Sequence, residues 1–486
     1  MGDPQYLSYP KLHLAQTVFT IASPSTQTSA KQTNLQVLQD VIRQDKMAPF
    51  YAYLAHPQNG KLNAPGESGS MSPTTSRTNT NAASPSPFQM LRRTSSINAP
   101  SIVGVLGGNV DTSVDFGWDD KLYEELKADN EKELETIQKE EDDAIEKAGD
   151  TEVQTAQGKR AEFFARIGDK DKALEEFEKL FEKTSILGTK IDIVLAIIRI
   201  GMFFDDKMLV KKNVDRAQQL VESGGDWDRR NRLKAYNGLH LLTIRSHSTA
   251  APLLLDSLST FTSTELCPYS SLVVYATLAG AVALPRRDFK SRVVDAPEIR
   301  AIFGSGDEED RLSALGGSAS AGVGAQDEMI IEEDGKPKPA TTTPKPTAVN
   351  LTTLASGSAS ADAQAQAEPH VDFKPLASMI QSLYSGNYSS FFKALAAVEQ
   401  DFLSTDRYLY EHKSWYVREM RLRAYAQLLQ SYKIVSLDSM AKSFGVSVEW
   451  LDKDLAPFIA SQRLPCVIDR VQGVVQTLRS DDKNRQ

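Results

Sequence analysis

Residues 436–478 read SLDSMAKSFGVSVEWLDKDLAPFIASQRLPCVIDRVQGVVQTL, and this stretch decides the fold. Four apolar residues of its first part recur at i, i+3, i+4 and i+7, which predicts one face of a two-turn helix. They are Leu437, Met440, Ala441 and Phe444. Gly445 is suited to end that helix, because glycine takes positive φ at no steric cost.

A second helix and a hairpin are predicted after Gly445. Ser447 offers a side-chain oxygen to the free N–H groups of the second helix, and Glu449 suits the positive end of its dipole. After Arg463 the apolar period changes to two, which predicts short strands at 466–468 and 474–477. Helix, turn, helix and hairpin together make a winged helix.

A winged helix has two common uses. Reading DNA requires cations that face phosphates, whereas residues 447–460 carry three acidic side chains against a single Lys453, which argues against nucleic acid as a partner. The other use is to offer an unpaired strand edge to another chain. The candidate interface residues are Cys466, Val467, Ile468, Val474 and Val475. A winged helix that only closes the end of a domain is the alternative.

Composition excludes several classes of protein. The 486 residues carry a net charge of −9, which argues against a general nucleic-acid binder. Two cysteines, Cys267 and Cys466, provide no disulfide framework and indicate a reducing, intracellular compartment. The sequence shows neither a signal-peptide pattern nor an apolar run of membrane-spanning length, so we expect a soluble protein with no membrane partner.

The rest of the chain divides into helical segments and two inserts. Residues 1–55 are expected to be an N-terminal helical segment. Residues 57–113 and 304–369 are rich in small and polar residues and are predicted to be disordered, because they cannot bury enough apolar area. Within the first insert, Arg92-Arg93-Thr94-Ser95 resembles a basic-directed kinase site, so Ser95 is a possible phosphosite. A chance match in a Ser-rich tract is the alternative.

A strongly acidic helix is predicted at 118–150. Residues 119–150 hold 14 acidic and 5 basic side chains. One interpretation is a solvated helix with one face packed on its neighbour, and the other is an arm that meets a basic partner.

Helix pairs are predicted over 155–303, with a last repeat at 370–435. Small and aromatic residues between 161 and 177 follow the tetratricopeptide spacing. Each pair buries its face only against the next pair, which favours a superhelix with extended protein-binding surfaces. The expected fold is therefore mainly α: a right-handed superhelix of tetratricopeptide-like hairpins, followed by a winged helix with a small β hairpin.

No catalytic arrangement is apparent in the sequence. The Gly-Lys pairs at 60–61, 158–159 and 335–336 are never followed by Ser or Thr, so there is no P-loop. The six histidines form no H-x-H or H-E-x-x-H cluster, and neither cysteine has an evident base. We therefore expect a protein that is not an enzyme and that has no cofactor and no metal.

Several motifs carry a resemblance to a known family. Helical repeats that run into a C-terminal winged helix are the layout of a PCI domain. The run 224–234, GGDWDRRNRLK, resembles the PCI lid subunits of the 26S proteasome regulatory particle, in particular the non-ATPase subunit-seven family. Shorter matches occur at 3–5, 47–49, 166–170, 258–263, 416–421 and 468–471. The first subunit of the signalosome is the nearest relative of that family.

This resemblance implies a structural role. Members of the family join other PCI subunits edge to edge in a hetero-oligomeric lid that supports ubiquitin-dependent protein degradation in the cytoplasm and nucleus. Alternatives are a PCI scaffold of the signalosome or of a translation-initiation factor complex, and more remotely a nucleic-acid-binding winged helix. The candidate contact residues in the 224–234 run are Asp226, Trp227, Arg229 and Arg230. Equally consistent is a turn in which Asp226 caps a helix and Trp227 packs between repeats.

The chain departs from the family in two ways. The inserts at 57–113 and 304–369 are not typical of it, and we expect them to be peripheral. Family members continue past the position of residues 481–484 with a C-terminal helix, whereas this sequence stops at Gln486. We therefore expect 479–486 to be a truncated tail, either of a truncated gene model or of a form that lacks one assembly contact.

Overall fold

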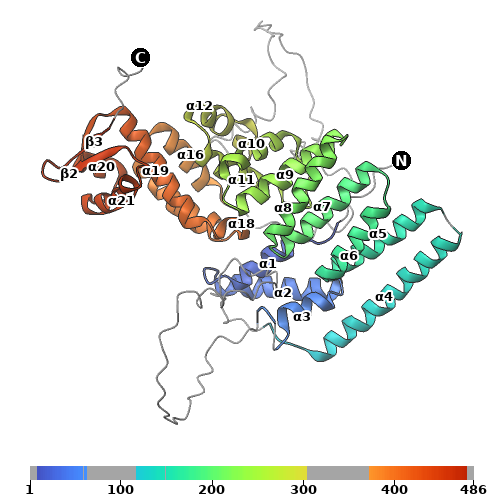
Figure 1. Ribbon diagram of the computed structural model, residues 1–486. Coiled ribbons are helices and arrows are strands. Elements are labelled where there is room, and N and C mark those ends of the chain that lie inside the picture. The colour runs from blue at the N-terminus through green and yellow to red at the C-terminus, as the bar shows by residue number, and fades with distance from the viewer. Residues whose placement is uncertain (1–7, 58–59, 63–115, 148, 304–370, 479–486) are drawn as a thin grey trace, which may run out of the picture.

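The computed structural model describes residues 8–57, 60–62, 116–147, 149–303 and 371–478 (Figure 1). Ser95, residues 479–486 and nearly all of the two predicted inserts lie outside the described residues.

Three helices at the start of the described chain pack together, and the first and third also contact helices further along the sequence. They are α1 (Leu12–Ala22), α2 (Thr28–Gln44) and α3 (Ala48–Ala55). The ring of Phe50 on α3 lies 5.3 Å from that of Phe203, centroid to centroid. The Gln16 side chain donates to the carbonyl oxygen of Thr405 at 2.7 Å and accepts from the N–H of Arg407 at 3.0 Å. The N-terminal helices therefore join the first half of the chain to the second.

Helix pairs make up the middle of the chain (Figure 1). Helix α4 (Asp120–Lys147) lies along α5 (Asp150–Ile167). The pairs that follow are α5 with α6 (Lys170–Lys183), α7 (Leu187–Phe203) with α8 (Lys207–Glu222), and α9 (Trp227–Thr243) with α10 (His247–Ser257). Beyond them lie η3 (Leu258–Thr260), α11 (Tyr269–Ala283), α12 (Arg286–Phe289), the π-helix η4 (Lys290–Val294) and α13 (Pro297–Phe303). One core runs through all of these helices.

The turn between α5 and α6 shows how local sequence ends one helix of a pair and begins the next. Gly168 ends α5 with a φ of 80°, and Asp169 caps α6 by accepting from the N–H of Lys172 at 3.3 Å. A Cβ added to Gly168 would lie 2.8 Å from the Cβ of Phe50, so the glycine also allows α3 to approach closely. Ala173 and Phe177 of α6 are buried, as their tetratricopeptide-like spacing suggests.

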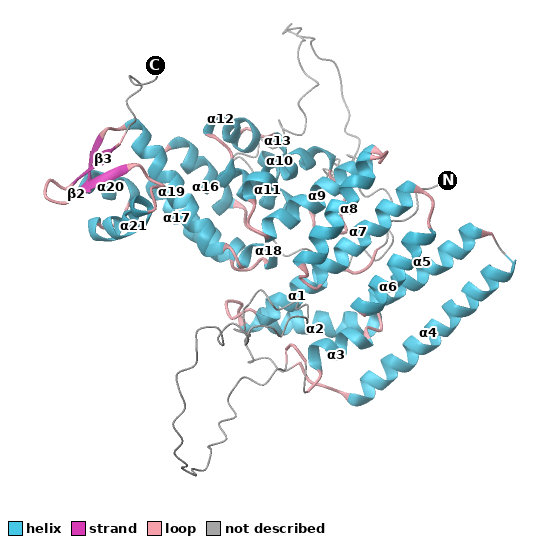
Figure 2. Cartoon of the chain, in the orientation of Figure 1, coloured by secondary structure: helices cyan, strands magenta, loops and turns pink. Residues whose placement is uncertain are grey.

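The C-terminal part ends in a small sheet. Its helices are α16 (Lys374–Ser385), α17 (Tyr388–Val398), the π-helix η6 (Glu399–Leu403), α18 (Arg407–Tyr410) and α19 (Lys413–Ser431). The winged helix comprises β1 (Ile434–Ser436), α20 (Leu437–Phe444), α21 (Val448–Ala460), β2 (Cys466–Asp469) and β3 (Val474–Thr477). Figure 2 shows the strands at one end of the molecule and α4 at the other. The predicted fold class, mainly helical with a small C-terminal sheet, is confirmed.

Local signals in the winged helix are confirmed in detail. The four apolar residues predicted to line α20 are all buried. Gly445 takes a φ of 68°, and the Ser447 hydroxyl oxygen accepts from the N–H of Trp450 at 3.3 Å. Strand β1 was not predicted, because a three-residue strand is too short to show an alternation of apolar and polar residues.

An aromatic cluster joins the winged helix to the last repeat. The ring of Phe444 on α20 lies 4.7 Å from Tyr388, 5.0 Å from Phe392 and 4.9 Å from Tyr425, centroid to centroid. The Tyr425 hydroxyl donates to Asp454 on α21 at 2.7 Å. Aromatic pairs at such distances add about 0.5–1.5 kcal/mol each beyond the burial of their area. The cluster therefore fixes the direction in which the sheet faces.

Substituting Gly168 by alanine tests the α5–α6 turn. Gly168→Ala is expected to lower the free energy of unfolding by at least about 1–2 kcal/mol, since alanine is strained at positive φ and its Cβ would meet Phe50. Gly158→Ala in the middle of α5 is the matched control, because a Cβ there meets only Leu180, at 3.9 Å. It should stabilise the helix by up to about 1 kcal/mol. Urea denaturation curves measure both, and equal midpoints for the two variants would contradict this account.

Candidate assembly surfaces

The sheet has the strand order β1-β3-β2, with both pairs antiparallel. Opposite residues in an antiparallel pair alternate between hydrogen-bonded and non-hydrogen-bonded positions. The N–H of Leu478 donates to the carbonyl oxygen of Pro465 at 2.8 Å, and that of Thr477 donates to Lys433 at 2.9 Å. These two bonds show, for each strand, which backbone groups point towards a neighbouring strand of the sheet.

The outward-facing backbone groups follow from this register. On β2, Val467 lies opposite Gln476 and bonds to β3, so the N–H and C=O of Ile468 point away from the sheet. On β1, Val435 bonds to β3, so the groups of Ile434 point away. The sheet thus presents two outer edges, one on β2 and one on β1.

The prediction that 474–477 supplies a free edge is wrong. Strand β3 lies between β1 and β2 and is paired on both sides, so its backbone cannot recruit another strand. Val475 is fully buried, and Val474 is half-buried. On β2, Cys466 is buried, Ile468 is half-buried and Val467 is 50% exposed. The second edge residue, Ile434, was missed together with β1.

The acidic side chains of α21 are largely paired within the chain. Asp454 lies 3.3 Å from Arg421 and accepts from Tyr425, and Asp452 lies 2.9 Å from Arg470. Helix α21 therefore shows less negative charge to solvent than its sequence predicts. The charged side chains that α21 exposes are Glu449 and Lys453.

Charged residues at the start of α9 bond to α7 and to Glu265, and so connect three parts of the chain. Asp226 accepts from the N–H of Arg229 at 3.1 Å and so caps α9. The Arg229 guanidinium donates to both carboxylate oxygens of Asp192 on α7, at 2.9 and 2.5 Å, and these bonds raise the pKa of Arg229 above its usual value. Arg232, which is buried, donates to Glu265 at 2.5 Å.

The four candidates in the 224–234 run therefore have two different environments. Asp226 and Arg229 act within the chain, as the capped-turn interpretation expects. The other half of that interpretation is wrong, because Trp227 is 65% exposed rather than packed between repeats. Arg230, one turn further along α9, is also exposed. Trp227 is the first residue of α9, and no pattern in the sequence signalled its exposure.

The acidic helix α4 packs with one face on its neighbours. Leu126 is buried, and Arg166 of α5 donates to Glu133 at 2.6 Å. Arg160 of α5 lies 3.2 Å from Glu141. The remaining acidic residues of α4 lie mostly on the outward face. This arrangement matches the interpretation of a solvated helix held by one face.

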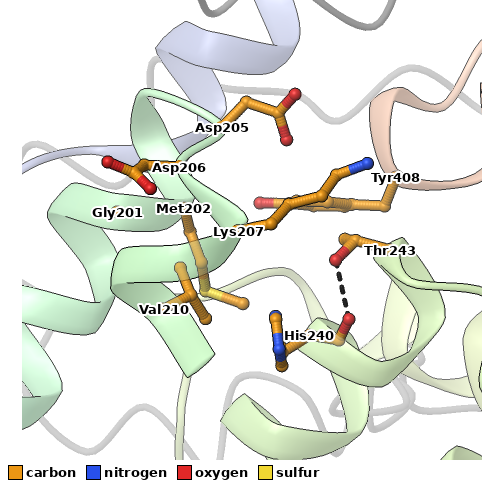
Figure 3. A pocket seen from close by; sticks show the side chains of 9 residues that line it. All are labelled: Gly201, Met202, Asp205, Asp206, Lys207, Val210, His240, Thr243 and Tyr408. Atoms are coloured by element: carbon orange, nitrogen blue, oxygen red, sulfur yellow. Dashed lines mark hydrogen bonds between the residues drawn. The ribbon is translucent and has the colours of Figure 1, made fainter. Parts of the chain in front are cut away.

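A small cavity lies where the turn between α7 and α8 meets α9 and α18 (Figure 3). Asp205, Lys207, His240 and Tyr408 are among the side chains that line it. Its volume is about 10 Å³, which is room for about one water molecule. Burial lowers the pKa of His240, which favours the neutral imidazole. These titratable groups converge, but the space between them would not admit a substrate.

The described residues contain no group of three or more His, Cys, Asp or Glu side chains that could hold a metal ion. Burial raises the pKa of the Cys466 thiol to about 11 and that of Cys267 further, so both thiols are protonated at neutral pH. No helix in the described part of the chain is long and apolar enough to cross a membrane.

Replacing Arg229 tests the network at the start of α9. Arg229→Ala should lower the free energy of unfolding by about 3 kcal/mol, because it leaves the largely buried Asp192 without its cation. Arg230→Ala is the matched control, since this neighbouring arginine is exposed and should change stability by less than about 0.5 kcal/mol. Chemical denaturation measures the free energy of unfolding of both variants. If Arg229→Ala left it unchanged, the network would not hold α7 and α9 together.

Two family models match the chain. The model for 26S proteasome subunit RPN7 matches residues 119–292, from the start of α4 into η4. The model for the PCI domain matches residues 394–479, from α17 through β3. The first model thus covers helical repeats and the second covers the winged helix, which are the two parts of the predicted layout.

Individual relatives extend these matches. The 26S proteasome regulatory subunit rpn7 of Schizosaccharomyces pombe is 37% identical over 381 residues, which are 78% of this chain and 80% of that protein. The regulatory subunit RPN7 of Saccharomyces cerevisiae is 38% identical over 374 residues, 76% of this chain and 71% of that protein. COP9 signalosome complex subunit 1 of Arabidopsis thaliana matches only 106 residues, 22% of this chain and 24% of that protein, at 27% identity. The predicted resemblance is confirmed, and it favours the proteasome over the signalosome: the chain belongs to the RPN7 family of 26S proteasome regulatory subunits, with a C-terminal PCI domain.

Proposed function

We propose that this protein is a non-catalytic structural subunit of the 26S proteasome lid, which joins other PCI-domain subunits and supports ubiquitin-dependent degradation in the cytoplasm and nucleus. The observation that carries the proposal is the pairing of a proteasomal family match over most of the chain with a terminal sheet that has two outer edges. A rigid array of helices that ends in such a sheet is suited to hold neighbours in place. The protonated cysteines are consistent with a protein without chemistry of its own.

The two outer edges suit assembly in a row. A strand of one neighbour can bond to the outward groups of Ile434, and a strand of another can bond to those of Ile468. Because the edges lie on opposite sides of β3, one subunit can pair with two neighbours at once. This geometry supports the proposal of a hetero-oligomer of PCI subunits.

Nucleic acid is a poorer partner for this winged helix. Neutralising several phosphates requires several exposed cations on one face. Helix α21 exposes Lys453 beside Glu449, and Arg470 is committed to Asp452. The exposed charges of α21 therefore nearly cancel.

A second contact is proposed at the start of α9. Trp227 and Arg230 are exposed one turn apart on the same side of the helix, and tryptophan and arginine are the residue types that most often dominate protein interfaces. Ile186, which directly precedes α7, is also 59% exposed. The Arg229–Asp192 bonds hold the first turns of α9 against α7. The proposed contact area is therefore Trp227 and Arg230 on α9, with Ile186 a separate exposed apolar side chain at the start of α7.

Proline at Ile434 tests assembly through the strand edge. Ile434→Pro removes an outward N–H, and proline is tolerated on an edge strand where that group faces solvent. Recovery of neighbouring PCI subunits with the tagged protein should fall by about tenfold or more, which corresponds to about 1.4 kcal/mol of lost affinity. Quantitative mass spectrometry of the purified particle measures the recovery.

Ile434→Val is the control for this test, because it keeps the N–H and a β-branched apolar side chain. Thermal unfolding should show that both variants are folded. Equal recovery of the neighbouring subunits with the proline and valine variants would contradict edge pairing at β1.

A further inference from the structure

Helix α19, which runs from the helical array to the winged helix, is bonded to the end of α11 (Figure 1). The guanidinium of Arg423 donates to the carbonyl oxygens of Ala281 and Leu284, both at 2.6 Å. Within a helix, the carbonyl of Ala281 would accept from the N–H four residues later, but that residue is Pro285, which has none. Arg423 therefore supplies a donor that α11 itself lacks, at the negative end of its dipole.

Two further donors lie on the same face of α19. The hydroxyl of Tyr416 donates to the carbonyl oxygen of Leu278 on α11 at 3.1 Å, and the amide of Gln427 donates to that of Leu383 on α16 at 2.9 Å. Tyr416, Arg423 and Gln427 are seven and four residues apart, which places them in one row along the helix. A slip of α19 by one turn would break all four bonds of this row together.

Arg423 makes these bonds without a carboxylate partner. Burial lowers the pKa of Arg423, and the titratable groups that also affect this pKa are Tyr416 and Arg286, with no carboxylate among them. A charge in such a place costs desolvation energy, and apolar side chains of similar volume are often at least as favourable for stability. What the arginine adds is direction, because its planar fork bonds to two carbonyl groups in one geometry.

We propose that Tyr416, Arg423 and Gln427 form a register lock, which fixes the axial position and the rotation of α19 on α11 and α16. Only Tyr432 and Lys433 separate the end of α19 from β1, so the position of α19 decides where the sheet lies relative to the array. Arg423 is thus a positioning residue for assembly. This last step rests on the proposed function, because the direction of the sheet matters only if its edges meet neighbours.

Distances between two spin labels on the free, full-length chain test the register lock. The labels are attached at Lys212→Cys on α8 and Lys442→Cys on α20, which are exposed positions, whereas the native Cys267 and Cys466 are buried. With Arg423→Met, the distance distribution should broaden or gain a second maximum displaced by about 5 Å, the rise of one helical turn. A distribution that Arg423→Met leaves unchanged would overturn the inference.

Two controls separate a change of position from a loss of stability. Arg418→Met removes an exposed arginine of the same helix and should leave the distribution unchanged. Labels at Lys393→Cys on α17 and at Lys442→Cys both lie on the C-terminal side of the lock, so their distance should stay the same in every variant. If Arg423→Met does not fold, Gln427→Met, which removes one neutral bond, makes the same comparison.

Recovery of neighbouring PCI subunits separates the register lock from edge pairing. Arg423→Met keeps both edges of the sheet but misdirects them, so recovery should fall about tenfold or more. Altered distances with full recovery would overturn the positioning role of Arg423. If the distances are unchanged while Ile434→Pro lowers recovery, the lock is refuted and the proposed function stands. If the distances change while Ile434→Pro leaves recovery unchanged, the lock stands and edge pairing is refuted.

Discussion

The contact of Phe444 with the rings of Tyr388, Phe392 and Tyr425 is the interaction on which the rest of the structure depends. It locks α20 to the last helical repeat, and the bond from Tyr425 to Asp454 adds α21 to the same joint. Because the joint is buried and aromatic, the sheet cannot swing freely relative to the repeats. Its two edges and its outer face therefore have fixed directions, which a subunit needs if it is to set the angle between its neighbours.

Charge in this protein is used mainly to hold helices together. The charged run at the start of α9 looks like a binding motif, yet Arg229 and Arg232 bond to Asp192 and Glu265 within the chain. Helix α4 follows the same rule, since Arg160 and Arg166 draw part of its acidic surface onto α5. The residues that stay exposed include Trp227 and Arg230 on the repeats and Val467 on the sheet.

Much of the fold could be predicted from local patterns, because those patterns have local causes. The apolar spacing in α20, the positive φ of Gly445 and the capping Ser447 each depend on residues within one or two turns. Strand β1 could not be found in this way, since its three residues are held by pairing with β3, some 40 residues away. The link from Gln16 to Thr405 and Arg407 is equally invisible to a local pattern. Of the candidate site, β2 was placed on an edge correctly, whereas β3 was misassigned because its neighbour β1 was missing from the prediction.

The central claim is that the outer backbone edges of the sheet are made for neighbouring subunits. Residue-resolved hydrogen exchange, on the free chain and in the assembled regulatory particle, tests it most directly. The amides of Ile434 and Ile468 should exchange fast in the free chain and become protected on assembly, while the inward amide of Val467 should be protected in both states. Outward amides that exchange equally fast in the free and the assembled protein would contradict the account.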